Sequence, residues 1–373
     1  MTRTFELLSR ICRSLAPCLL LLLTSCVSML GSQRTTVAIP ERQNYSGAPL
    51  TGDISKIEAQ TSELHGRYGR EYKSEVLNQT TTEFNLRGDV LSVLSCDDEY
   101  SQGESRQYAY NDEGRLVMRT EKFASGGYEH RYTLDEYGCV VLHEVFDESG
   151  VLESSTSIEY DLRGNDVEYV TRDGNGRERG VVVRIFNEAN LLAELIRYSG
   201  DEEVRGRETY SYDDAGRLVE SVTYEGYDMV QKRVCVEYGE NELDRVQITY
   251  NDQDEVVEHY AESYDTESRL VERCEYDAQG VVVERMTMSY DAAGRKLSET
   301  LLGADDKPLK VRTYSYNEDG LLAEEVEDDL QQKTYSLVVY AYDDRGNLVE
   351  ERAYLTKYKV PQYIVEYAIT YRE

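Results

Sequence analysis

The stretch that decides the fold reads Tyr210-Ser211-Tyr212-Asp213-Asp214-Ala215-Gly216-Arg217-Leu218. Asp at the first position of a turn and Gly at the fourth are typical of a type I β-turn that ends in a G1 bulge. Glycine is favoured at that last position because it adopts a positive φ at no steric cost. The stretch therefore predicts a hairpin in which Asp213 pairs with Arg217 and Tyr212 with Leu218. Continued by strict alternation, the same register places Tyr210 opposite Glu220.

This aromatic-(Asp/Asn)-x-x-Gly segment recurs along most of the chain. Counted from the aromatic residue, here called the anchor, its copies begin at Phe84, Tyr110, Leu134, Tyr160, Phe186, Tyr212, Tyr238, Tyr264, Tyr290, Tyr316 and Tyr342. Every step is 26 residues except the step of 24 to Leu134, whose copy is degenerate. A fixed period of this length indicates one supersecondary unit used many times. The turn residues we expect to hold these hairpins include Asp213, Gly216, Arg217, Asp291, Gly294, Arg295, Gly320 and Gly346.

A second turn lies twelve residues past most anchors, as in Phe146-Asp147-Glu148-Ser149-Gly150 and Tyr276-Asp277-Ala278-Gln279-Gly280. Each unit is then a pair of antiparallel strands of about nine residues each. Eleven units predict an all-β fold, an antiparallel meander of about twenty-two strands without helix. Sheets of more than about ten strands curl, split or close because twist accumulates from strand to strand. We therefore expect a curled, superhelical open sheet or a hollow shell.

Period-2 alternation predicts which side chains share a face of this sheet. One face receives the anchors, the residues two before them and a recurrent Glu eight residues after them. Tyr hydroxyls beside a row of Glu indicate charge-assisted hydrogen bonds along that face. We interpret it as a candidate interaction face, represented by Tyr108, Tyr210, Tyr314, Tyr340, Glu194, Glu220, Glu324 and Glu350. A purely structural ladder of tyrosines explains the same pattern, because aromatic pairs stabilise sheets.

The motif Tyr-x-Tyr-Asp-x-x-Gly-Arg-Leu at residues 210–218 resembles the YD repeat of the Rhs proteins and teneurins. The resemblance covers residues 80 to 360, nearly all of the repeat region. It implies a β-sheet that winds into a hollow shell around a toxic cargo or forms a large extracellular barrel. The period of 26 is a few residues longer than usual for that family, and we identify no Rhs core motif, self-cleaving aspartates or toxin segment.

The N-terminus has the pattern of an export signal. Basic residues precede an apolar run that is too short to span a bilayer, and the run ends in Leu23-Thr24-Ser25-Cys26. This ending resembles the bacterial lipobox, which implies cleavage and a lipid on Cys26. An ordinary signal peptide that happens to end near a cysteine is the alternative. We expect a lipoprotein signal peptide at residues 1–25, a flexible tether at 26–52 and the β-repeat domain at 53–373.

Composition excludes some classes of function and leaves others without support. The formal net charge of −31 disfavours nucleic acid as a partner, because binding phosphates needs a basic surface. The four histidines share no repeat position, and we predict no catalytic residue, metal site or cofactor. Export permits disulfides, yet Cys96, Cys139, Cys235 and Cys274 occupy different repeat registers, so we expect free thiols.

The preferred hypothesis is a non-enzymatic, lipid-anchored envelope protein whose repeat sheet is a scaffold or a binding surface for a protein or glycan. One alternative is a carbohydrate-binding surface lipoprotein, and another is a shell fragment of an Rhs-type toxin system. Carboxylate-based hydrolysis is the weakest alternative, because the recurrent Glu positions look alike and an active site needs a differentiated pair. Val27 in place of Asp indicates the outer membrane or the cell surface if the host is Gram-negative.

Overall fold

The computed structural model describes residues 34–67, 70–96, 103–355 and 361–373 of the 373-residue chain. The expected signal peptide and Cys26 lie outside the described residues. The described residues form strands and turns only, and they contain no helix long and apolar enough to cross a bilayer. All of the strands belong to one antiparallel sheet in which each strand pairs with its neighbours in the sequence.

The sheet has 24 strands. They are β1 (Ile54–Arg67), β2 (Arg70–Phe84), β3 (Val90–Cys96), β4 (Glu104–Tyr110), β5 (Leu116–Phe123), β6 (Gly126–Leu134), β7 (Val140–Asp147), β8 (Leu152–Tyr160), β9 (Asp166–Asp173), β10 (Glu178–Phe186), β11 (Leu192–Ser199), β12 (Val204–Tyr212), β13 (Leu218–Glu225), β14 (Met229–Tyr238), β15 (Arg245–Asn251), β16 (Val256–Tyr264), β17 (Leu270–Tyr276), β18 (Val282–Tyr290), β19 (Lys296–Gly303), β20 (Pro308–Tyr316), β21 (Leu322–Asp329), β22 (Thr334–Tyr342), β23 (Leu348–Tyr354) and β24 (Tyr363–Tyr371). The eleven repeat units account for β2 to β23, as the period predicts.

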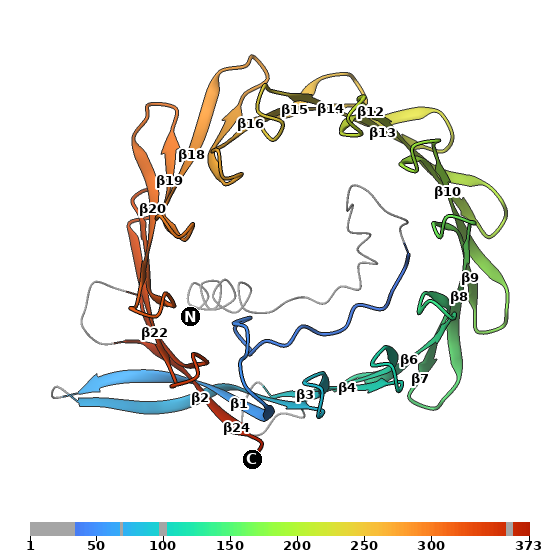
Figure 1. Ribbon diagram of the computed structural model, residues 1–373. Coiled ribbons are helices and arrows are strands. Elements are labelled where there is room, and N and C mark those ends of the chain that lie inside the picture. Colours follow the sequence, from blue (N-terminus) through green and yellow to red (C-terminus); the bar gives the residue numbers. More distant parts are fainter. Residues whose placement is uncertain (1–33, 68–69, 97–102, 356–360) are drawn as a thin grey trace.

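The two additional strands close the sheet. β1 pairs with β2 on one side and with β24 on the other, in a register that runs from Ile57 opposite Ile369 to Glu63 opposite Tyr363. The fold is therefore a closed barrel (Figure 1), and the expectation of an open superhelical sheet with about twenty-two strands is corrected. With strands about 4.8 Å apart and tilted by about 35–45°, such a barrel is roughly 45–50 Å across.

The turn after every anchor except Tyr238 has the predicted geometry. The turn after Tyr238 is longer, with the N–H of Gly239 donating to the carbonyl of Asp244 and no bulge in the register of β14 and β15. In the clearest copy, Gly216 donates its N–H to the carbonyl of Asp213 and has a φ of 79°. Asp213 Oδ1 accepts the N–H groups of Ala215 and Arg217, and Oδ2 accepts Arg217 Nε at 2.7 Å. The same Asp–Arg bond joins Asp291 to Arg295. Gly294, Gly320 and Gly346 all have a φ near 80°.

The bulge of this turn reverses part of the predicted face assignment. Tyr212 lies opposite Leu218 as predicted, but Ser211 lies opposite Glu220 and Tyr210 opposite Ser221. Two residues of one strand face one of its partner at a bulge, so the alternation shifts by one. The Glu eight residues past the anchor therefore lies on the face opposite the tyrosines, and the predicted pairing of Tyr210 with Glu220 is wrong.

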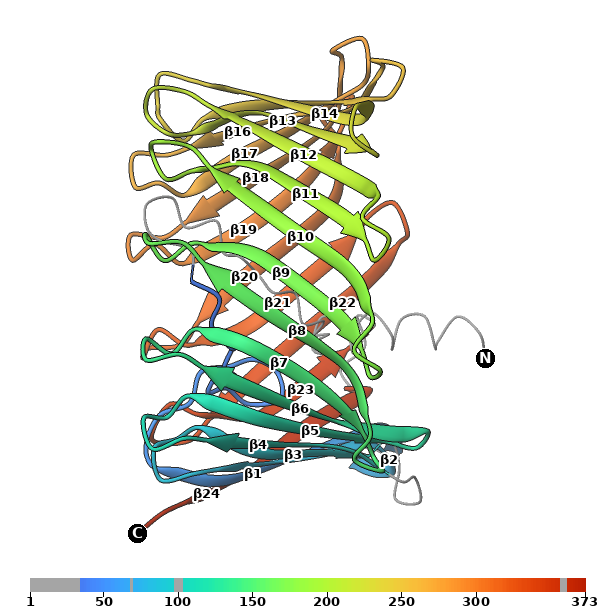
Figure 2. The same ribbon diagram turned by 90° about the vertical axis from the view of Figure 1, so that its right-hand side faces the viewer.

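Residues 34–53, called the lumenal segment below, run along the inside of the barrel (Figure 1). The segment lies beside the turns that follow the anchors, and these turns form one end of the barrel, the anchor rim (Figure 2). The N–H of Val140 donates to the carbonyl of Thr35, and Thr51 donates its N–H to Asn347 Oδ1 at 2.7 Å. The described part of the expected flexible tether is thus packed against the wall.

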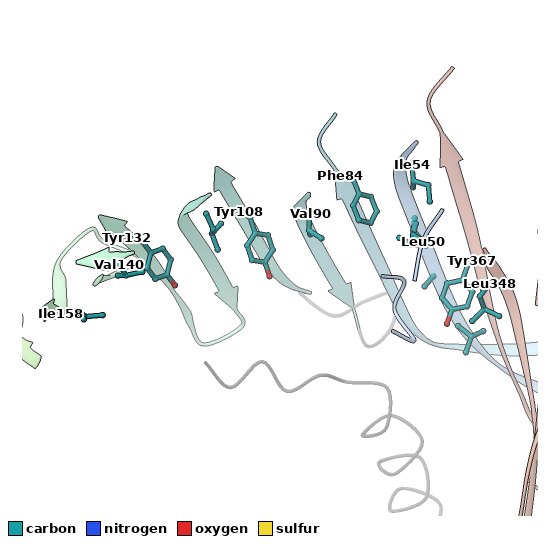
Figure 3. Packing of buried hydrophobic residues seen from close by; sticks show 14 of the residues in the cluster. Leu50, Ile54, Phe84, Val90, Tyr108, Tyr132, Val140, Ile158, Leu348 and Tyr367 are labelled. Atoms are coloured by element: carbon teal, nitrogen blue, oxygen red, sulfur yellow. The ribbon is translucent and has the colours of Figure 1, made fainter. Parts of the chain in front are cut away.

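The only continuous cluster of buried apolar side chains among the described residues lies between this segment and the wall. Leu50 and Ile54 pack there with wall residues such as Phe84, Val90 and Tyr108 (Figure 3). Because these side chains share the face of the anchors, the anchor face lines the lumen. The Glu row consequently lies on the outer surface.

A matched pair of substitutions tests the left-handed turn position. Gly294→Ala brings the new Cβ no closer than 3.8 Å to Arg269, so its cost comes from the backbone alone. We expect a loss of roughly 1 kcal/mol in unfolding free energy, because an L-residue is strained at positive φ. Ser268 occupies the same turn position with a φ of 63°, so Ser268→Gly should have the opposite sign. Urea unfolding followed by circular dichroism measures both, and two losses of equal size would contradict the turn geometry.

Candidate functional site on the lumenal wall

The anchor tyrosines connect neighbouring repeat units through their hydroxyl groups. Each of seven anchors donates its hydroxyl to the backbone carbonyl twenty residues earlier, at 2.7–3.1 Å. The pairs are Tyr110 to Val90, Tyr160 to Val140, Tyr212 to Leu192, Tyr238 to Leu218, Tyr290 to Leu270, Tyr316 to Lys296 and Tyr342 to Leu322. The accepting carbonyl belongs to the first residue of its strand. This residue lies before the first backbone pair that its strand forms with the following strand. The hydroxyl thus takes the place of a backbone donor, which explains the choice of Tyr over Phe.

The turn arginines add a second link between units. Arg217 lies over the ring of Tyr238 at 4.3 Å from its centroid, and Arg295 lies over Tyr316 at 4.6 Å. Each arginine is held at the same time by the Asp of its own turn. The N–H of Arg217 is the first of several contacts that lower the pKa of Asp213, so this carboxylate stays charged. Turn, arginine and next anchor form one repeated contact along the anchor rim.

The second tyrosine row, two residues before the anchors, lines the middle of the lumen. Tyr210 donates to Glu208, which also accepts Arg197 Nη1 at 2.7 Å. Tyr340 donates to Glu325 at 3.4 Å, and Tyr108 is only 8% exposed. Tyr314 lies on the same face, since its partner Glu325 does. These tyrosines meet carboxylates as predicted, but the carboxylates are lumenal ones and belong to other repeat positions.

A buried charge cluster of the lumen surrounds Glu262, whose side chain is 6% exposed. Its carboxylate accepts Arg245 at 2.8 Å, Arg273 at 3.2 Å and the hydroxyl of Tyr264 at 3.0 Å. Arg273 also lies over the ring of Tyr260, 4.1 Å from the centroid. A carboxylate with this many donors is a fixed part of the wall, and its two arginines offset the cost of burying its charge.

The lumen also contains a histidine pair that the sequence analysis missed. His130 Nδ1 and His143 Nε2 are 3.1 Å apart, and the ring of Tyr132 stacks on His143. Burial, assisted by the positive charge of Arg119, lowers the pKa of His130 to about 4, and burial does the same for His143. The thirteen-residue spacing carries no repeat signal. The bulge in the predicted turn at 135–138 shifts the register by one residue and so puts the two rings on the same face.

The predicted interaction face is divided between two surfaces. Tyr108, Tyr210, Tyr314 and Tyr340 lie in the lumen, whereas Glu194, Glu220, Glu324 and Glu350 lie outside. On the outer surface Arg207 binds Glu194, and Arg352 Nε lies 2.6 Å from Glu350. The tyrosine and glutamate rows therefore cannot form one binding surface.

Groups that favour metal or redox chemistry do not come together in the described part of the chain. No three His, Cys, Asp or Glu side chains there are placed to hold a metal ion. The four described cysteines, Cys96, Cys139, Cys235 and Cys274, are free thiols, as expected from their different registers. Cys139 and Cys274 are each buried at their own place in the wall.

Comparison with known proteins gives limited likenesses. No family model matches the chain, and no curated protein matches it. The solved structure of TcdB2-TccC3 without its hypervariable C-terminal region is 13% identical and aligns with 81% of this chain at a TM-score of 0.29. This chain spans only 21% of that protein's length. A porin-like protein from Bacteroides uniformis is also 13% identical, with 85% of this chain and 96% of that chain aligned at a TM-score of 0.23. The function must therefore be argued from the chain itself.

Removing one anchor hydroxyl tests its contribution. Tyr238→Phe keeps the ring but leaves the carbonyl of Leu218 without the hydroxyl donor, so we expect a loss of about 1–2 kcal/mol in unfolding free energy. The anchor Phe186 shows that Phe fits the position sterically, so packing should be unchanged. Thermal unfolding of the variant and the wild type measures the effect, and an unchanged midpoint would refute this contribution.

The histidine pair predicts acid sensitivity. A histidine with a lowered pKa in the folded state gains protons mainly on unfolding, so stability is full above about pH 6.5 and falls as the pH drops toward 4. The slope is at most about 1.4 kcal/mol per pH unit for each histidine. The double variant His130→Gln with His143→Gln should lose this part of the pH dependence. The exposed His65, changed to Gln, is the control, and equal pH profiles for all three proteins would contradict the assignment.

Proposed function

We propose that this chain is a non-enzymatic, lipid-anchored envelope protein whose closed wall encloses a binding space for a protein partner. The observation that carries the proposal is the pairing of β1 with β24, which converts a repeat sheet into a container. The resemblance of the repeat to the YD repeat supports the same function, since that family builds shells. The lipobox-like sequence at Cys26 supports the anchor.

The size of the lumen fits a protein partner. Side chains extend about 5 Å from the inner face of a sheet, which leaves a lumen on the order of 35 Å wide. A globular domain of about 50 residues has a radius of gyration of about 10 Å and is roughly 25 Å across, so it fits beside the lumenal segment. The hydrogen bonds between the lumenal segment and the wall reach Val140 and Asp166 on one side and Asn347 and Glu351 on the other, so residues 34–53 leave the strands from β10 to β21 without such bonds.

The charged side chains on the outer surface favour a wall that is surrounded by water rather than by lipid. Ion pairs such as Arg207 with Glu194 and Arg233 with Glu220 lie on strands in the middle of the sheet. An Arg or Lys on the lipid side of a barrel costs about 2–4 kcal/mol at the bilayer midplane. Repeated charges of this kind support attachment through a lipid rather than insertion of the wall itself.

The chemistry of the lumen favours a protein over a glycan. Aromatic side chains that bind sugars need a free ring face, yet Arg273 covers Tyr260 and burial leaves Tyr108 little exposed surface. The lumenal hydroxyls already donate to carbonyl and carboxylate oxygens of the wall. Mixed charges and partly exposed apolar groups such as Met286 and Met288 suit a polypeptide surface, since Met side chains adapt to varied partners.

Crosslinking inside and outside the wall tests this proposal. Met288 and Ser289 are neighbours on β18, but Met288 faces the lumen and Ser289 the outside. A photoreactive benzoylphenylalanine at position 288 should give a discrete protein adduct on irradiation of intact cells, with at least five times less adduct at position 289. Equal yields at the two positions, or an adduct that contains only saccharide, would contradict a protein partner. The saccharide result would favour the carbohydrate-binding alternative.

A further inference from the structure

The tips of the anchor-rim turns differ from one side of the barrel to the other. Three of the first four turns expose a large apolar side chain at the tip: Leu86 is 84% exposed, Tyr137 61% and Leu162 108%. The remaining seven turns carry mostly acidic, alanine or small polar residues at the two matching positions. These pairs are Glu188-Ala189, Asp214-Ala215, Glu240-Asn241, Thr266-Glu267, Ala292-Ala293, Glu318-Asp319 and Asp344-Arg345. Leu243, in the turn after Tyr238, is 41% exposed, and the three most exposed apolar tips form one sector, defined by Leu86, Tyr137 and Leu162.

Three arginines lie beside these apolar tips, together with Asp89, Asp135, Glu136 and Asp161 of the same turns. Arg87 follows Leu86 and Arg163 follows Leu162 directly at the turn tips. Arg34 lies over the ring of Tyr137, 4.7 Å from its centroid. The intervening turn, with Asp112-Glu113, is acidic. Exposed Leu and Tyr flanked by Arg are typical of surfaces that contact the headgroup region of a bilayer.

The course of the chain connects this sector with the expected lipid. Arg34 is the first described residue, and it lies in the sector between Tyr137 and Gly164. A Cβ added to Gly164 would be only 2.7 Å from Arg34 Nε. Cys26 precedes Arg34 by eight residues, which reach at most about 28 Å when extended. The opposite side of the rim is roughly 45–50 Å away. A lipid on Cys26 therefore lies close enough to hold this side of the rim, rather than the opposite side, at the bilayer.

We infer that the sector of Leu86, Tyr137 and Leu162 contacts the surface of the bilayer and fixes the orientation of the barrel. The inference deepens the proposed function and rests on its lipid anchor. In this orientation the anchor rim faces the membrane, and the opposite rim points away from it (Figure 2). A partner then enters the lumen from the end that is distant from the bilayer.

Single tryptophans report this contact, because the chain contains no Trp. Leu162→Trp and Leu86→Trp replace exposed side chains in the sector, and Ala292→Trp is the matched control at an exposed tip outside it. Each full-length variant, purified from cells that export it, is reconstituted into vesicles of phosphatidylethanolamine and phosphatidylglycerol with brominated acyl chains. The tryptophans at 162 and 86 should emit at shorter wavelength and be quenched at least twofold more than the tryptophan at 292.

A parallel measurement separates the anchor from the contact. Labelling of cells with an alkyne fatty acid should mark the wild type and not Cys26→Ala. If the protein is labelled and floats with the vesicles but all three tryptophans are quenched alike, the sector does not contact the bilayer and only this inference fails. If the protein carries no fatty acid and stays in the aqueous phase, the lipid anchor is wrong and this inference fails with it.

Discussion

The wall depends on one recurrent local contact, in which the side-chain oxygen of the Asp or Asn that follows an anchor accepts backbone N–H groups of its own turn. In the copy at Asp213 these are the N–H groups of Ala215 and Arg217, and the left-handed Gly216 completes the reversal. The bulge then sets which residues face the lumen. Because this bulge recurs in every unit except the one at Tyr238, the wall has one inner face of tyrosines and one outer face with glutamates.

Links between units convert a row of hairpins into a continuous wall. The anchor hydroxyl reaches the carbonyl at the start of the preceding hairpin's second strand, and the turn arginine covers the next anchor. The residue type at the fifth position after the anchor is different at the turn that binds the lumenal segment through Thr51. Arg217 and Arg295 occupy this position in the open half, whereas Asn347 binds Thr51 there through its amide. Asn347 thus contributes an amide that holds the segment at this turn.

Much of the fold could be predicted from the repeat, and part of the candidate site could not. The turns at Gly216 and Gly294, the Asp–Arg pairs and the shared face of the tyrosines were predicted from local chemistry. Glu220 was assigned to the wrong face because strict alternation ignores the residue that a G1 bulge adds. His130 and His143 were overlooked for the same reason, since only the bulged register of β6 and β7 brings their rings together.

The sequence by itself determined the hairpin unit, its period and the twenty-two strands of the eleven units, because turn type depends on residues within one short segment. Tertiary structure alone decided that the sheet closes. The pairing of β1 with β24 joins residues 300 or more positions apart, and neither strand belongs to one of the eleven repeat units. It also decided which face is the lumen and where residues 34–53 lie, since both follow from the accumulated twist and from contacts across the closed ring.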